Sequence, residues 1–362
     1  MHRLMVAAIP LLLIAGCSNM AYYAQAVDGQ IRLMAATRPI HELIVDDATV
    51  PELRRQLLQT TAIRDFASRE LDLPDNASYR SYADLGRPYA VWNVFAAPEF
   101  SLEPQQWCFA LVGCINYRGY YDKNDAEHFA EELSQAGLDT YVRGVPAYST
   151  LGYFSDPMLN TILRFGDQEV ARIIFHELAH QLVYAEGDST FNESFATAVE
   201  NEGMRRWLAR STPLQRRSFG AQQERKAQFH RLLGDTRDKL RAIYASSLEP
   251  VAMRNAKSLV IAEMQQTYAA LKTGWGGYSG YDQWFSQSLN NAALGSIAIY
   301  TQWVPGFELL LEQEGRNLPR FYRRVAALAK LTKSERSAIF GLLLSNRMAN
   351  IVQSPKWLNP LK

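Results

Sequence analysis

Residues 173–207 read IIFHELAHQLVYAEGDSTFNESFATAVENEGMRRW, and this stretch sets the expected fold and chemistry of the chain. His176 and His180 stand four positions apart, so on an α-helix they lie on one face and can bind a single metal ion. Glu177, next to the first histidine, is placed to orient and deprotonate a water without being a ligand itself. This HExxH pattern on a largely apolar helix is typical of zinc-dependent peptide hydrolysis.

The third metal ligand is expected from the second half of the same stretch. Glu193 lies near the start of a second predicted helix, and Glu200 follows seven residues later on the same face. Zinc accepts a carboxylate beside two imidazoles and leaves a fourth position for water. We therefore expect Zn²⁺ to be bound by His176, His180 and Glu193, with Glu200 supporting the site from outside.

Two alternatives stay open for this region. Residues 190–193 read TFNE, which matches a capping box in which Glu193 would bond the backbone at the helix start. Asp188 follows the second histidine by a short loop, so it is a candidate third ligand, an outer supporting carboxylate or a turn residue. A histidine ligand six residues after the motif is excluded, because position 186 is Glu.

The overall composition is that of a globular protein. The 362 residues are 48% hydrophobic, which is enough for a large core. With 38 basic and 37 acidic residues the net charge is +1, and no basic patch indicates nucleic-acid binding. No internal repeat or low-complexity linker is present, which favours one catalytic domain over 46–362, after a leader over 1–16 and a lipid-anchored tether and helix over 17–45.

The N-terminus, MHRLMVAAIPLLLIAGCSNM, predicts an export signal. Its apolar run is too short to span a bilayer as a mature helix but suits the core of a signal peptide. Residues 14–17 resemble the lipobox of bacterial lipoproteins, which implies lipidation of Cys17, and Ser18 after it favours the outer membrane, facing the periplasm. An ordinary signal peptide with an incidental cysteine is the alternative.

Cys108 and Cys114 are the two cysteines that remain once Cys17 is used. In an exported protein such a close pair predicts a disulfide across a hairpin. Metal binding by the pair is disfavoured, because no second Cys or His pair lies nearby to complete a tetrahedral site.

The pattern of elements predicts an α+β fold that is mostly helical. Helices are expected over 21–43, 51–71 and 125–136, with Ala62, Ile63, Phe66 and Leu71 as the buried stripe of the second. Strand residues dominate 78–119 and 140–145, and a loop covers 146–156. After Trp207 the chain is expected to be almost wholly helical.

Further site residues are less strongly marked by the sequence. Three tyrosines are candidates to stabilise the oxyanion of the reaction: Tyr300, Tyr281 and Tyr148. The loop 148–153 is a candidate edge for a peptide backbone. Four acids near the predicted site could meet a substrate amine: Glu103, Asp156, Glu186 and Asp188.

Two resemblances follow from these motifs. NESFATAVE resembles the NEGFA segment of gluzincin aminopeptidases, in which a glutamate seven residues beyond the ligand supports a zinc histidine. The spacing from His180 is shorter here, and the GxMEN motif for the substrate amine is absent. The segments GCINYRGYY, GVPAYSTLGYFSDPMLNTIL, IFHELAHQ and LNNAALGSIAIY resemble a family of bacterial lipoproteins classed as predicted zinc aminopeptidases.

These resemblances imply a zincin-like catalytic domain with a small mixed sheet, a Zn²⁺ cofactor and a peptide substrate. The expected function is a zinc-dependent aminopeptidase anchored in the cell envelope. An envelope endopeptidase and a non-catalytic lipoprotein with a structural zinc site are the alternatives, although a structural site normally closes its fourth position with protein.

Overall fold

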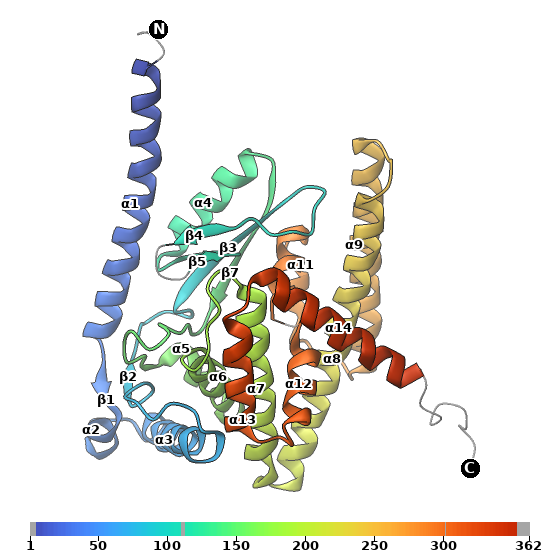
Figure 1. Ribbon diagram of the computed structural model, residues 1–362. Coiled ribbons are helices and arrows are strands. Elements are labelled where there is room, and N and C mark those ends of the chain that lie inside the picture. The colour runs from blue at the N-terminus through green and yellow to red at the C-terminus, as the bar shows by residue number, and fades with distance from the viewer. Residues whose placement is uncertain (1–4, 110–112, 301, 353–362) are drawn as a thin grey trace, which may run out of the picture.

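The computed structural model describes residues 5–109, 113–300 and 302–352, with side chains described from residue 20 to residue 345 inside these ranges (Figure 1). The fold is α+β and mostly helical, as the sequence predicts. The helices are α1 (Met5–Ala35), α2 (Ile40–Val45), α3 (Pro51–Leu71), α4 (Lys123–Gln135), α5 (Asn160–Leu163), α6 (Asp167–His180), α7 (Ser189–Ala209), α8 (Pro213–Tyr244), α9 (Pro250–Gly274), α10 (Asp282–Phe285), α11 (Asn291–Ala298), α12 (Val304–Gln313), α13 (Leu318–Ala329) and α14 (Lys333–Val352).

The strands form small sheets rather than one large one. An antiparallel sheet has the order β6-β3-β7, a mixed sheet has the order β1-β2-β8, and β4 pairs with β5 as a hairpin. A disulfide joins Cys108 to Cys114 across that hairpin. The strands are β1 (Arg38–Pro39), β2 (Ser81–Ala83), β3 (Val91–Pro98), β4 (Trp107–Phe109), β5 (Gly113–Ile115), β6 (Arg118–Tyr120), β7 (Leu138–Val145) and β8 (Met158–Leu159).

The largest hydrophobic core surrounds the pair α6 and α7, which pack directly on each other. Phe175 of α6 and Phe195 of α7 are fully buried, and helices α3, α12 and α13 supply further apolar side chains. The two helices approach closely at Gly203, where an added Cβ would lie 2.6 Å from the ring of Phe175. Because α7 is buried on most of its surface, the acids that it carries lie inside the protein and need partners.

A second layer stands beside this core. The long helices α8 and α9 form an antiparallel hairpin (Figure 1) and share a separate hydrophobic cluster with residues 275–297. Helix α8 buries Phe229 and Leu240 in this cluster.

The N-terminal helix α1 extends beyond the body at its beginning and docks on the body with its end (Figure 1). Tyr22 lies 4.0 Å from the guanidinium of Arg118, and Leu33 is buried in the main core. Within the ranges that the structure describes, no helix combines the length and apolar character needed to cross a membrane. Cys17 lies outside the residues whose side chains are described.

Two sequence predictions need correction. Helix α3 has the predicted bounds, with Pro51 at its first turn, but Ala62 faces solvent while Ile63, Phe66 and Leu71 are buried. Residues 190–193 do not form a capping box, because α7 begins earlier, at Ser189, and Asp188 caps it by accepting from the backbone N–H of Phe191 at 3.1 Å. The carboxylate of Glu193 is thereby left for other contacts.

Candidate metal centre

The last turns of α6 and the first turn of α7 bring two histidines and a glutamate together. Oε2 of Glu193 lies 3.1 Å from Nε2 of His176 and 3.6 Å from Nε2 of His180. The two imidazole rings stand nearly perpendicular, with centroids 4.9 Å apart. All three residues are buried.

This donor set fits a tetrahedral metal ion. One ligand atom from each residue can be chosen so that all of them lie within 4.8 Å of one another. Ligands bound to zinc at about 2.0–2.1 Å in tetrahedral geometry are separated by roughly 3.4 Å, close to the two separations from Glu193. Two imidazoles and one carboxylate also match the ligand chemistry of zinc and leave one position open.

The buried carboxylate of Glu193 needs a positive charge beside it, which either a protonated histidine or a bound cation can supply. Burial opposes the charged form of His176, but hydrogen bonds with Glu193 and Glu200 outweigh it and raise the pKa of His176 to about 10. Burial likewise opposes the Glu193 carboxylate, yet the two histidines lower its pKa to about 2. A divalent cation would replace the proton that these groups otherwise share.

Glu200 fixes the orientation of His176 from the far side of the ring. Its carboxylate lies 3.1 Å from Nδ1 of His176, which leaves Nε2 of that ring directed at Glu193. Arg172 at 2.8 Å and Lys226 at 3.6 Å hold the other oxygen of Glu200. Although burial raises the pKa of Glu200, Arg172 and Lys226 lower it more strongly, so the carboxylate stays ionised.

Glu177 and Tyr300 lie beside this group. Glu177 is partly exposed, and burial raises the pKa of its carboxyl group while the two histidines oppose the shift. The ring of Tyr300 lies 6.3 Å from that of His176, centroid to centroid. Burial and the charge of Glu193 raise the pKa of Tyr300, so its phenol keeps its proton and can donate a hydrogen bond.

The loop between the two helices is locked by side chains of α7. Asn192 accepts from the backbone N–H of Ala185 at 2.7 Å and donates to the carbonyl of the same residue at 2.9 Å. Asp188 caps α7 and forms a buried ion pair of 2.9 Å with Arg336 of α14. Both carboxylate oxygens of Asp188 are thus engaged at the start of α7, and Asp188 is not part of the group that the histidines form with Glu193.

The other candidate residues are dispersed. Tyr281 stacks on Phe229 with ring centroids 4.1 Å apart, in the cluster between α8 and α9. Tyr148 hydrogen bonds with Tyr121 and Gln30, beside the end of α1. Among the four acids, Glu103 and Glu186 are exposed, whereas Asp156 is buried.

Sequence reasoning missed several residues near the centre. Arg172 precedes His176 by four positions on α6, so helical spacing alone could have placed it on the same face. Tyr117 is a different case. Burial first, and then the charge of Glu193, raise the pKa of Tyr117, but nothing in its position along the chain predicts that it lies near Glu193. Arg143 of β7 likewise acts electrostatically on Tyr300, across a separation that only the fold closes.

Comparison with known proteins identifies the family of the chain. The chain matches the family described as "Putative aminopeptidase" over residues 21–340, and it belongs to that family. No curated protein and no solved structure matches the chain.

Proposed function

We propose that this protein is a zinc-dependent aminopeptidase with a zincin-like catalytic fold, held in the bacterial envelope as an outer-membrane lipoprotein facing the periplasm. The convergence of His176, His180 and Glu193 beside Glu177 is the observation that carries the proposal. Membership of the aminopeptidase family supports the peptidase class independently.

Each residue of the group has a defined task in this mechanism. Nε2 of His176, Nε2 of His180 and a carboxylate oxygen of Glu193 would bind the ion, and Glu200 keeps the first ring oriented. When bound, zinc supplies a Lewis acid for the peptide carbonyl and lowers the pKa of water.

The proton transfers belong to the protein's own side chains. Glu177 takes a proton from the attacking water on its carboxylate and returns that proton to the nitrogen of the leaving amine. The hydroxyl of Tyr300 donates a hydrogen bond to the oxyanion of the tetrahedral intermediate. Burial of the group limits the access of bulk water, which strengthens both interactions.

Metal analysis and kinetics test this proposal together. The purified protein should contain one zinc, Glu193→Ala should lose it, and Glu177→Ala should keep it while hydrolysis of peptides is abolished. Glu131→Ala, at an exposed glutamate of α4, serves as the matched control and should keep both zinc and activity. Full zinc retention in Glu193→Ala, or full turnover in Glu177→Ala, would contradict the assigned roles.

The exopeptidase character needs its own measurement. Acetylation of the N-terminus of a good substrate should reduce kcat/KM by about tenfold or more, since a charged hydrogen bond is worth about 1.5–3 kcal/mol. Equal cleavage of free and acetylated peptides, at internal bonds, would make the protein an endopeptidase that uses the same residues.

A further inference from the structure

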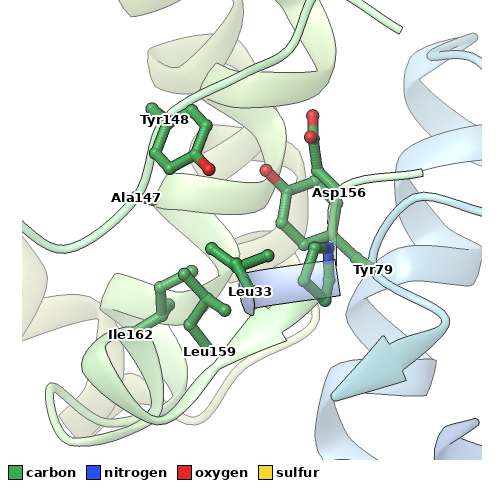
Figure 2. Close-up of a pocket in the computed structure, with 8 residues that line it drawn as sticks. Leu33, Tyr79, Ala147, Tyr148, Asp156, Leu159 and Ile162 are labelled. Carbon is green, nitrogen blue, oxygen red and sulfur yellow. The ribbon is translucent and has the colours of Figure 1, made fainter. Parts of the chain in front are cut away.

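A small cavity lies between the end of α1, the segment that leads into β2 and the loop 146–157 (Figure 2). The space open to the centre of a water molecule is about 10 Å³, so the cavity has room for one water or one group of similar size. Its walls are mostly apolar, but Tyr79, Tyr148 and Asp156 carry polar groups. The full set of lining residues is Leu33, Tyr79, Ala147, Tyr148, Asp156, Pro157, Leu159 and Ile162.

Tyr79 contributes a hydroxyl without a partner. The side chain is 1% exposed, and its Oη forms no hydrogen bond with any residue that the structure describes. Figure 2 shows this hydroxyl turned toward the hydroxyl of Tyr148, across the space between the two rings. Tyr79 also lies in a turn with a φ of +63°, a left-handed conformation that is strained for a bulky residue.

Asp156 contributes a buried carboxylate without a cation. It is 4% exposed and accepts from the backbone N–H and the hydroxyl of Thr150, at 3.0 and 2.7 Å. It forms no ion pair within the described ranges. Burial raises the pKa of its carboxyl group to about 6 although hydrogen bonds with Thr150 and Gln181 oppose the shift, so it is mainly ionised at neutral pH. An unpaired buried charge of this kind is costly unless a ligand compensates it.

The cavity is electrostatically linked to the metal centre. The charge of Glu177 adds to the effect of burial in raising the pKa of both Tyr79 and Asp156, so all three groups lie within electrostatic range of one another. The backbone N–H of Tyr79 donates to the carbonyl of Asp156 at 2.6 Å, which holds the two polar walls together. A group bound here would therefore face one acidic side chain, Asp156, and the unpartnered hydroxyl of Tyr79, with the charge of Glu177 within electrostatic range.

We propose that Asp156 and Tyr79 bind the α-ammonium group of the peptide substrate, an assignment that rests on the proposed aminopeptidase function. An ammonium group has about the size of a water molecule. It carries the positive charge that would pair with the Asp156 carboxylate, and it donates the hydrogen bond that Oη of Tyr79 can accept. The apolar walls strengthen this charge pairing because they exclude solvent. A substrate with a blocked N-terminus would fail to enter, which gives the exopeptidase its direction.

Kinetics with two substrates test the assignment. One is a leucyl peptide, and the other is the same peptide with leucine replaced by 4-methylpentanoate, which lacks only the amine. Wild-type protein should prefer the free amine by about tenfold or more in kcat/KM. Asp156→Asn should remove most of this preference by weakening only the leucyl substrate, and Tyr79→Phe should reduce it several-fold.

Two controls separate substrate binding from support of the loop. Thr150→Val removes the hydrogen bond of the Thr150 hydroxyl to Asp156 but keeps the backbone hydrogen bond and the carboxylate, so it should retain the preference for the amine. Asp84→Asn, at an exposed aspartate, should leave both substrates unaffected. Equal losses for both substrates in Asp156→Asn, matched by Thr150→Val, would overturn the proposal and assign Asp156 to loop structure.

A binding experiment keeps this test independent of peptidase activity. Calorimetry on the protein as isolated should show that 3-methylbutylamine binds at least about tenfold more tightly than 3-methylbutan-1-ol, and Asp156→Asn should abolish the difference. That result would support the ammonium site even if no peptide were hydrolysed, in which case only the proposed function would fail. Equal binding of amine and alcohol by wild-type protein would show that the cavity holds a water instead.

Discussion

At the scale of single residues, the centre is built from a chain of charged groups that fix one another. Glu193 touches both histidines, Glu200 holds His176 from its other nitrogen, and Arg172 holds Glu200. None of these buried charges is isolated, which is the condition under which a protein tolerates them. The sequence predicted Glu193 and Glu200 from spacing alone, because both project from one face of one helix.

The hydroxyl of Tyr300 can be removed without removing its ring. Tyr300→Phe keeps the ring against His176 but removes the hydroxyl that would stabilise the oxyanion. We expect kcat to fall by about 10²–10³, the usual cost of one oxyanion donor, with zinc content and KM little changed. Tyr281→Phe, in the cluster between α8 and α9, is the matched control and should retain activity. A Tyr300→Phe variant with wild-type kcat would remove this residue from the mechanism.

At the scale of elements, the connection between α6 and α7 sets the position of the proposed metal ligands. Asn192 bonds both backbone groups of Ala185, and Asp188 joins the start of α7 to Arg336 of α14. The start of α7, which carries Glu193, is therefore tied to a helix that follows it by more than a hundred residues. Such a dependence has no signature in local sequence.

Breaking this buried ion pair should be costly. Arg336→Met leaves Asp188 charged and buried without its partner, so we expect a loss of about 3–5 kcal/mol in the free energy of unfolding. Arg320→Met removes an exposed ion pair with Glu314 and should cost less than about 1 kcal/mol. Urea unfolding of both variants measures the difference, and similar values for the two would mean that the pair carries little of the stability at the start of α7.

Local patterns were sufficient for some elements and not for others. The bounds of α3 follow from Pro51 at its start and from apolar spacing, and both signals act within the helix itself. The capping box was wrong because two adjacent caps compete, and Asp188 wins through its contact with Arg336, which sequence does not reveal. The cavity at Asp156 was equally hidden, since Tyr79 meets it only after β2 pairs with β8.

At the scale of the whole molecule, α8 connects the outer helical hairpin to the centre. Lys226 reaches Glu200 from this helix, and His230 lies one turn further along. Burial first, and then the charge of Lys226, lower the pKa of His230 to about 4. The stability of the molecule is therefore coupled to pH at a histidine that lies outside the proposed ligand set but within electrostatic range of Glu200.

The direction of this pH dependence follows from linkage. Unfolded histidine has a pKa of about 6.5, so between pH 6.5 and 4 the unfolded chain binds a proton that folded His230 does not. Its contribution is complete above pH 6.5 and is lost as the pH falls toward 4, by about 1–3 kcal/mol in all. Urea unfolding at several pH values should show a shallower acid loss in His230→Gln than in wild type, whereas His128→Gln, at an exposed histidine, should follow wild type. The same dependence of the unfolding free energy on pH in wild type, His230→Gln and His128→Gln would contradict the assignment of the acid loss to His230.

The placement of α1 bears on how the molecule would lie relative to a membrane. Tyr22 contacts Arg118 and Gln30 accepts from Tyr121, so this helix is fixed to the body from a point five residues after Cys17. Five helical residues span only about 7.5 Å, and a lipid on Cys17 would therefore hold the body close against the bilayer. A line of exposed apolar side chains on α1 would then face the membrane: Met20, Tyr23, Val27 and Ile31.

Removing the lipidation site distinguishes membrane binding by the lipid from membrane binding by the apolar side chains of α1. Cys17→Ser should move the protein from the membrane fraction to the soluble fraction, because four exposed apolar side chains bind a bilayer far more weakly than several acyl chains. Mass spectrometry of the wild-type N-terminus should find Cys17 acylated, and replacing Cys108 and Cys114 together by serine should leave the partition unchanged. If Cys17→Ser stayed with the membrane after a high-salt wash, the apolar face of α1 would be a sufficient anchor and the lipid would be dispensable.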